Sequence, residues 1–398
     1  MKDKESSETK VAEKVIFPSS TIGVIGNSPN GIELVRKAKQ MGFKVAAYGS
    51  NAESPTLREA DMAIVGRGND QLQLQKFAER CDLVIYESEQ VSSESIKFIQ
   101  RFTNVPQGSE ALELMQDRLL ERTFFEQINV NIAPYSTIVS LDDIYQAISS
   151  IGFPCVLKPI QKGLMHNSQF ILRKQSDVAK CAELVEQGTF VLESWVPYER
   201  EISIVMVREQ SGTMRFLAPL ETFYQVHHLN QVVGPAKVAD QIWDELKNIA
   251  SQIGDNLNYV GVMEVGFFLT QSQAIYVKRI VPALHESGYI YQYISNVSLE
   301  EEQIRAAVNM PVVTSKIIQQ AAIGFFQEKD QQSIKTQWVL KDNWFYHFFR
   351  YPASMLPQSK SGFVAITADD GYEAKKQLDS TGIWDEEQPT EEKNENQE

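Results

Sequence analysis

The feature that most constrains the fold is an alternation of apolar runs and an amphipathic stretch near the start of the 398-residue chain. Residues 21–26 are short, β-rich and apolar, residues 31–41 are amphipathic, and residues 43–48 are apolar again. A strand, a helix and a second strand in this order indicate a doubly wound parallel sheet. Two more strand-like runs continue the pattern, at residues 62–65 and 83–87. The sequence therefore predicts an α/β fold with an N-terminal α/β domain over residues 16–107.

The middle of the chain mixes short strand-like runs with helices. Helical patterns span residues 109–127 and 141–151. The strand-like runs are short and apolar, at residues 138–139, 154–158, 169–172 and 189–193. Residues 201–207 alternate between polar and apolar, which predicts a half-buried strand. We assign residues 108–310 to one domain.

The end of the chain predicts a smaller, β-rich domain over residues 311–385. Its strand candidates are residues 337–340, 345–349 and 362–367. The two ends of the chain, residues 1–15 and 386–398, are polar and offer little to bury, so we expect disordered tails there.

Composition excludes several function classes. A net charge of −14 argues against general nucleic-acid binding, which needs a basic surface. No apolar run approaches the length that crosses a membrane, and the polar start lacks the apolar core of a secretory signal. Cys81, Cys155 and Cys181 lack metal-ligand spacing, which favours reduced structural thiols and a cytoplasmic protein.

Two neighbouring segments carry a resemblance to a known family. GVMEVGFFLT (residues 261–270) and IYVKRIVPALHESG (residues 275–288) resemble the paired strands where ATP-grasp ligases hold magnesium and ATP. The nearest pattern is that of N5-carboxyaminoimidazole ribonucleotide synthetases, whose second strand reads approximately Asn-Glu-Ile-Ala-Pro-Arg-Pro-His-Asn-Ser-Gly. The resemblance covers about residues 20–370. It implies an ATP-grasp domain between an N-terminal pre-ATP-grasp domain and a small C-terminal β-rich domain. It also implies a homodimer, and a ligase that carboxylates 5-aminoimidazole ribonucleotide with ATP and bicarbonate.

The same resemblance implies an ATP site. Arg118, in QDRLL, and Lys158, after PCVL, match positions that face the phosphates. In the hinge segment LESWVP, Glu193 and the backbone of Val196 would contact adenine. Glu201, in YEREIS, falls where the family has its ribose-binding glutamate.

The phosphate-covering loop departs from the family pattern. The family reads Gly-Tyr-Asp-Gly-Lys-Gly-Gln, whereas residues 163–169 read GLMHNSQ and keep one glycine and Gln169. Glycines let backbone N–H groups approach a triphosphate, so their loss predicts weaker closure. His166 could donate to a phosphate, although a loop histidine more often faces water.

The metal positions depart further. Magnesium takes oxygen ligands, usually carboxylates. Gly266 replaces the first family carboxylate, and Lys278-Arg279 replace Asn-Glu at the second. Two cations there would repel magnesium and attract phosphate, unless they simply point to solvent. Magnesium is therefore a doubtful cofactor.

The catalytic residues stay open, with three candidates. Glu264 shares a strand face with Gly266 by the two-residue period and could substitute as a metal ligand. Glu286 and His285 are the other candidates.

The resemblance also implies a site for a phosphorylated small-molecule acceptor. Its matching residues are Gly26, Gly31, Glu87, His285 and Ser287. Other family positions differ, because Pro29 replaces a glutamine and Ala283 replaces a phosphate-binding arginine.

Three functions remain open. The chain could be a homologue whose ligase activity is lost or impaired and which binds a nucleotide or a partner. It could be an active ligase whose metal site has moved to Glu264 and Glu286. It could also be a structural dimer partner with an empty cleft.

Overall fold

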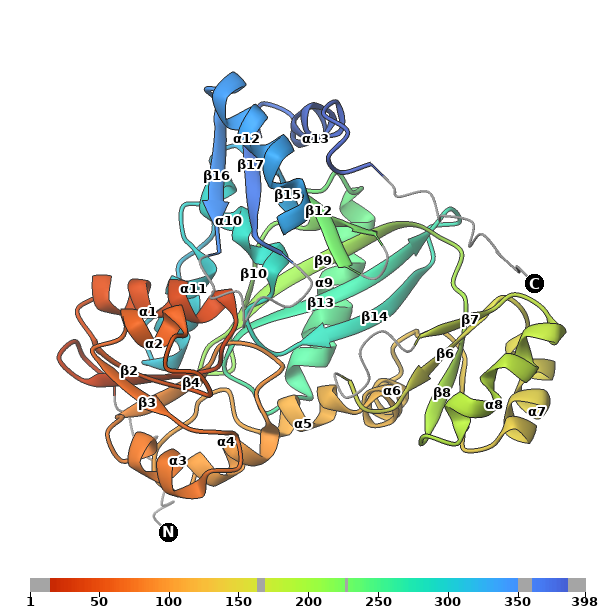
Figure 1. Cartoon of the computed structure of the whole chain (residues 1–398), viewed down its shortest axis with the longest axis horizontal. Helices are drawn as coiled ribbons and strands as arrows, with labels where there is room; N and C mark the ends of the chain where they lie inside the picture. The colour runs from red at the N-terminus through yellow and green to blue at the C-terminus, as the bar shows by residue number, and fades with distance from the viewer. Residues whose placement is uncertain (1–14, 163–168, 226–227, 350–359, 386–398) are drawn as a thin grey trace, which may run out of the picture.

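The computed structural model describes residues 15–162, 169–225, 228–349 and 360–385. The chain forms three sheets (Figure 1). The N-terminal sheet and the small central sheet lie on opposite sides of a large sheet. No helix among these residues has the length and apolar character needed to span a bilayer.

The N-terminal sheet confirms the predicted parallel arrangement. Its strand order is β3-β2-β1-β4, and all pairs are parallel. Helix α1 (Pro29–Gln40) begins where Ser28 accepts a hydrogen bond from the N–H of Asn30 and where proline occupies the first helical position. The other elements of this region are β1 (Thr21–Ile25), β2 (Lys44–Gly49), α2 (Pro55–Glu59), β3 (Met62–Val65), α3 (Gln71–Ala78), β4 (Leu83–Tyr86) and α4 (Ser93–Ile99).

The small central sheet is antiparallel and has its own core. Its strand order is β5-β8-β6-β7. Apolar side chains from its strands pack against those of neighbouring helices, with Cys155 and Cys181 buried among them. The elements are β5 (Tyr135–Ile138), α7 (Leu141–Ile151), β6 (Cys155–Pro159), β7 (Phe170–Leu172), the 3-10 helix Gln175–Cys181, α8 (Ala182–Val185) and β8 (Phe190–Ser194).

The large sheet has nine strands and runs through the predicted boundary at residue 310. Its order is β14-β13-β9-β11-β12-β15-β17-β16, with β10 beside β9. The strands are β9 (Tyr198–Arg208), β10 (Met214–Phe216), β11 (Leu220–Gln225), β12 (His228–Gly234), β13 (Gly261–Thr270), β14 (Ile275–Val281), β15 (Gln320–Phe326), β16 (Trp344–Phe348) and β17 (Gly362–Ala368). The accompanying helices are α9 (Asp240–Asp255), α10 (Tyr291–Ile294), α11 (Leu299–Ala307), α12 (Gln331–Leu340) and α13 (Gly371–Asp379).

Three local expectations were wrong. Residues 337–340 form the end of helix α12, not a strand, and Trp338 packs on Tyr346 of β16 with ring centroids 4.9 Å apart. Tertiary packing therefore overrides the β-propensity of a short apolar run. Residues 201–207 are buried on both faces, because the polar face of β9 meets other polar side chains rather than water. The helix expected over residues 109–127 is two helices, α5 (Glu110–Gln116) and α6 (Arg118–Gln127), because Asp117 caps the second.

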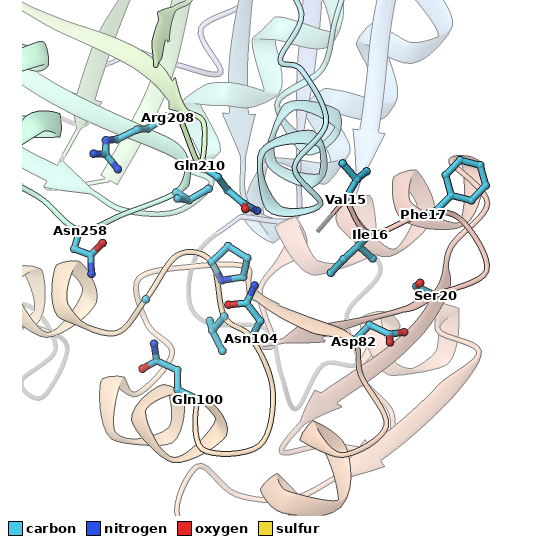
Figure 2. Close-up of a pocket in the computed structure, with 14 residues that line it drawn as sticks. Val15, Ile16, Phe17, Ser20, Asp82, Gln100, Asn104, Arg208, Gln210 and Asn258 are labelled. Atoms are coloured by element: carbon cyan, nitrogen blue, oxygen red, sulfur yellow. The ribbon is translucent and has the colours of Figure 1, made fainter. Parts of the chain in front are cut away.

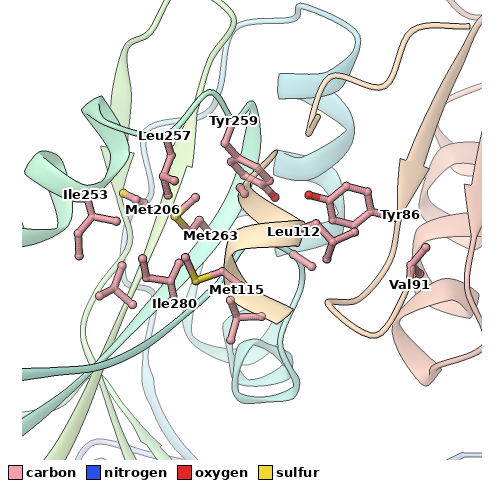
Figure 3. Close-up of a cluster of buried hydrophobic side chains, with 14 of the residues drawn as sticks. Tyr86, Val91, Leu112, Met115, Met206, Ile253, Leu257, Tyr259, Met263 and Ile280 are labelled. Atoms are coloured by element: carbon pink, nitrogen blue, oxygen red, sulfur yellow. The ribbon is translucent and has the colours of Figure 1, made fainter. Parts of the chain in front are cut away.

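A buried apolar cluster joins the N-terminal domain to the large sheet. Helix α5 lies between β4 on one side and β13 on the other, and its Leu112 is fully buried (Figure 3). The cluster also draws on α9 and the loop after it. Its labelled members are Tyr86, Val91, Leu112, Met115, Met206, Ile253, Leu257, Tyr259, Met263 and Ile280.

We expect Leu112→Ala to lower the free energy of unfolding by about 2–5 kcal/mol, because it opens a cavity at this junction. Leu120→Ala on α6 is the matched control, because Leu120 is 47% exposed. The control should change stability by less than about 0.5 kcal/mol. Urea unfolding of both variants measures the difference, and equal losses would contradict the assigned role of α5.

Candidate functional site

The predicted site residues gather on one face of β9, β13 and β14. Gly266 of β13 pairs with Arg279 of β14, whereas Phe267 pairs with Val277, so Lys278 is the extra residue of a β-bulge. The bulge turns two consecutive side chains to the same face. A methyl group at Gly266 would lie 3.6 Å from Cγ of Arg279 and 3.9 Å from Cβ of Lys278.

Lys278 is held inside the protein, so of the two alternatives for this cation the structure disfavours the one in which it points to solvent. Its Nζ donates to the carboxylate of Glu201 over 2.5 Å and lies 3.7 Å from the ring centroid of Tyr224. Burial, reinforced by repulsion from Arg279, lowers the pKa of Lys278 to about 8, although Glu201 opposes this shift. Glu201 therefore has a cation as its partner within the chain.

Arg279 also has internal partners. Its Nη2 donates to the hydroxyl of Tyr224 over 2.7 Å and lies 2.9 Å from Nε2 of His285. Since arginine can only donate, Nε2 of His285 accepts. The other ring nitrogen, Nδ1, lies 3.2 Å from the carboxylate of Glu264.

Glu264 is 1% exposed, and both of its carboxylate oxygens accept hydrogen bonds. It accepts from Ser203 over 3.2 Å and from the hydroxyl of Ser287. Burial opposes ionisation of Glu264, but His285, Arg279 and Ser287 outweigh it and lower its pKa to about 2. Glu264 does share the face of Gly266, as predicted, since it contacts Ser203, which pairs with Gly266.

The central sheet and helix α6 supply a second group of charges. Glu193 accepts from Lys158 over 2.6 Å and from Arg122 over 2.9 Å. Glu121, which is 1% exposed, accepts from Lys162 over 2.7 Å. Two residues predicted to touch opposite ends of the nucleotide, Lys158 and Glu193, thus form an ion pair.

Arg118 and Arg122 lie one helical turn apart on α6, so their side chains share a side of the helix. Arg118 donates to the carbonyl of Pro159 over 2.6 Å, and Arg122 donates to the carbonyl of Lys278 over 3.2 Å. Arg122 therefore links the central sheet to β14. Arg122 was not predicted from the sequence, although its four-residue spacing from Arg118 was a usable signal.

The residues predicted to bind the acceptor substrate come from segments that are far apart in the sequence and adjacent in the structure. The Glu87 side chain fills the space beside Gly26, leaving no room for a side chain there, and accepts from the N–H of Ser28 over 2.8 Å. Asn30 donates to the carbonyl of Leu284 over 2.9 Å and accepts from Tyr289 over 2.6 Å. The first loop therefore lies against the loop that holds His285 and Ser287. Gly31 packs against Thr56 of α2 and lines the turn only through its backbone.

Glu286 forms an ion pair with Lys360, a residue that was likewise not predicted from the sequence. Burial opposes ionisation of Glu286, but Lys360 and His285 lower its pKa. Nζ of Lys360 lies 4.2 Å from the ring centroid of Phe325. The C-terminal region thus supplies a cation at the edge of the site.

The remaining predicted residues lie in the hinge segment between β8 and β9 and in the loop before β7. Val196 is buried between β8 and β9, and the neighbouring Trp195 is 41% exposed. Gln169 is half-buried just before β7. His166 lies outside the described residues.

Magnesium does not fit this arrangement. Gly266 offers no ligand, Arg279 is a cation, and both substitute carboxylates already have partners. Among the described residues, no group of three or more His, Cys, Asp or Glu side chains is arranged to hold a metal ion.

A nucleotide fits better. Nη1 of Arg122 is buried and has no hydrogen-bond partner among the described residues, so an acceptor from a ligand would complete it. Lys158 and Glu201 face this region with the charges that phosphates and ribose hydroxyls require.

A separate hollow lies elsewhere, between residues 15–20 and the far end of β9 (Figure 2). It measures about 900 Å³, and no predicted site residue lines it. Its polar groups already serve the fold, because Asp82 accepts from the N–H of Thr21 and Arg208 donates to the carbonyl of Tyr259. We therefore place the functional site at the charged face of β9, β13 and β14.

Glu193→Gln tests the ion pairs of the central sheet. The change leaves Arg122, which is 6% exposed, without its main counter-charge. We expect the free energy of unfolding to fall by roughly 3 kcal/mol, because an unpaired buried charge is costly. Glu110→Gln, at an exposed position of α5, is the control and should be neutral in urea unfolding. A neutral Glu193→Gln would contradict the pairing.

Glu87 predicts a pH dependence. Burial raises its pKa from 4.5 to about 7, against the opposing hydrogen bonds of Ser28. Between these values the folded state binds more protons than the unfolded state, so the contribution of Glu87 to stability falls as the pH rises. We expect Glu87→Gln to gain on the order of 2 kcal/mol relative to the wild type between about pH 4.5 and pH 8.

Urea unfolding across this pH range measures the effect of Glu87→Gln. Glu245→Gln, at an exposed position of α9, should follow the wild-type pH profile. A constant difference between Glu87→Gln and the wild type would show that Glu87 ionises normally.

Comparisons with known proteins identify the domains and the family of this chain. Residues 19–116 match the profile of the ribonucleotide synthetase preATP-grasp domain, and residues 123–299 match that of the ATP-grasp domain. The chain is 31% identical over 302 residues to the N5-carboxyaminoimidazole ribonucleotide synthase of Bacillus subtilis, covering 76% of this chain and 80% of the relative. It is 25% identical to that of Staphylococcus saprophyticus, covering 90% and 96%.

Solved structures agree as well. An ADP complex of an N5-carboxyaminoimidazole ribonucleotide synthetase superposes with a TM-score of 0.89 at 27% identity, covering 94% of this chain and 98% of the other. The Aspergillus clavatus enzyme, in complex with ADP and 5-aminoimidazole ribonucleotide, shows the same fold with a TM-score of 0.83 at 19% identity, covering 92% and 98%. The chain therefore belongs to the N5-carboxyaminoimidazole ribonucleotide synthase family, with ATP-grasp and pre-ATP-grasp domains.

Proposed function

We propose that this chain is an adenine-nucleotide-binding member of the family that has lost the magnesium-dependent carboxylation of 5-aminoimidazole ribonucleotide. One observation carries the proposal. At the two positions where the family pattern has metal-binding carboxylates, the chain has Gly266 and Arg279, which lie against each other on paired strands. A reaction that needs magnesium beside the phosphates has no ligands for it there.

Nucleotide binding is supported by the groups that the cleft keeps. By the family pattern, Lys158 and Arg118 would face the phosphates and Glu201 the ribose, while Glu193 and Val196 would contact adenine. A solved relative at 27% identity is an ADP complex. The proposed role is therefore binding of ATP or ADP by a homodimer, as the family resemblance implies, in the cytoplasm, as the cysteine pattern favours.

An active ligase would need the relocated ligands Glu264 and Glu286. Glu264 is held by Ser203, Ser287 and His285, and Glu286 is held by Lys360. Recruiting either carboxylate to a metal would break these contacts, which favours the inactive alternative.

We expect no phosphate release above background when the protein is mixed with ATP, Mg²⁺, bicarbonate and 5-aminoimidazole ribonucleotide. We expect ADP to raise the thermal unfolding temperature, because ligand at 100 times its dissociation constant adds about 2.7 kcal/mol to the stability of the folded state. A family enzyme with both carboxylates present is the positive control for turnover.

Two results would contradict the proposal. Magnesium-dependent turnover that Glu264→Ala abolishes would identify an active ligase with a relocated metal site. Absence of a thermal shift with any adenine nucleotide would identify a structural protein with an empty cleft.

A further inference from the structure

We propose that Lys278 and Arg279 form a metal-independent polyphosphate site, in which two side-chain cations replace the divalent ion that would otherwise neutralise a nucleotide. The inference rests on the proposed nucleotide binding and names how the phosphates are held. The ligand class is a nucleoside di- or triphosphate free of metal.

The β-bulge is the first support. It places two consecutive cations on the same face, directly over Gly266, where a regular strand would turn one of them away. Their positions are fixed by buried contacts: Lys278 is held by Glu201 and the ring of Tyr224, and Arg279 is held by Tyr224 and His285. The pair is therefore preorganised for a ligand.

Donors that have no partner are the second support. Arg279 makes hydrogen bonds to Tyr224 and His285 through Nη2 alone. Its Nε and Nη1 make no hydrogen bond to the described residues. Lys278 gives one of its three N–H groups to Glu201, and Lys158 likewise gives one to Glu193. Guanidinium and ammonium groups with unused donors are the usual partners of phosphate oxygens.

Surplus positive charge is the third support. The ion pairs that line both halves of the cleft contain more cations than carboxylates. The cations are Arg122, Lys158, Lys162, Lys278 and Arg279, and the carboxylates are Glu121, Glu193, Glu201 and Glu264. Arg118 adds a further cation that contacts a carbonyl. Lys158 of the central sheet contributes to lowering the pKa of Lys278 in the large sheet, so the two cations are close enough to repel each other.

This arrangement reverses the usual effect of magnesium. A nucleotide that carries Mg²⁺ would bring a divalent cation beside two fixed cations, whereas the metal-free nucleotide brings only negative charge. Excess Mg²⁺ should therefore weaken binding of ADP instead of strengthening it.

Calorimetric titration tests the inference with two probes, ADP and inorganic tripolyphosphate, each with EDTA and with excess Mg²⁺. For the wild type we expect both probes to bind in EDTA and Mg²⁺ to weaken them. Arg279→Gln should weaken binding in EDTA at least about tenfold, as for the loss of a charge-assisted hydrogen bond, and Arg279→Lys should recover part of it. Lys335→Gln, at an exposed position of α12, is the matched control for net charge and should bind like the wild type.

A variant that restores the family residues gives the opposite result. Gly266→Glu combined with Lys278→Asn and Arg279→Glu should bind ADP only when Mg²⁺ is present. A Cβ atom at position 266 would make only ordinary van der Waals contacts, so the backbone can accommodate a side chain there. Thermal unfolding without ligand checks that each variant is folded.

The outcomes separate the two proposals. If the wild type binds ADP only with Mg²⁺, or if Arg279→Gln binds as well as the wild type, the cationic site is refuted while nucleotide binding stands. If tripolyphosphate binds in EDTA and ADP does not, the cationic site stands and adenine-nucleotide binding is refuted. If neither probe binds under any condition, both proposals fail.

Discussion

Charge pairing inside a mostly buried cleft is the constraint on which the rest of the site depends. Glu193, Glu201 and Glu264 are each less than a tenth exposed, and a buried carboxylate is tolerated when cations and hydrogen-bond donors satisfy it. Each of the three has such a partner from another strand or helix. The ion pair of Glu193 with Arg122 joins the central sheet to helix α6, and the hydrogen bond from Arg122 to the carbonyl of Lys278 joins that helix to the large sheet.

The same constraint explains how the site departs from its family without losing its fold. A cation at position 279 would be costly beside apolar groups, but here it meets Tyr224, His285 and the charge of Glu264. Lys278 meets Glu201 in the same way. The substitutions at positions 266, 278 and 279 are thus compatible with one another. Because the three positions adjoin one another on paired strands, they act as one set and not as three independent changes.

Much of the architecture could be predicted from local pattern. The parallel N-terminal sheet follows from the alternation in residues 21–48, because strands buried on both faces read as continuous apolar runs. Residues 337–340 were misassigned because a segment of four residues is too short to show a period that separates helix from strand. The polar face of β9 was misassigned because its sequence cannot show that Ser203 meets Glu264.

The candidate site was predictable only in part. Motif positions identified Lys158, Glu201 and Arg279, because each stands in a segment with a recognisable pattern. Arg122 and Lys360 were missed because their contacts with Glu193 and Glu286 join segments that are far apart in the sequence. The bulge that turns Lys278 inward is likewise a property of strand pairing, which no single segment reveals.

The continuous hydrogen-bonded ladder from β12 into β15 has a consequence for how this protein can diverge. Strand β15 covers what would otherwise be an open edge of β12, and bare edges invite pairing with other chains. Strands β15, β16 and β17 are consequently an integral part of the large sheet and not a separable appendage. A family member that changes its chemistry therefore still has to keep the pairing of β12 with β15.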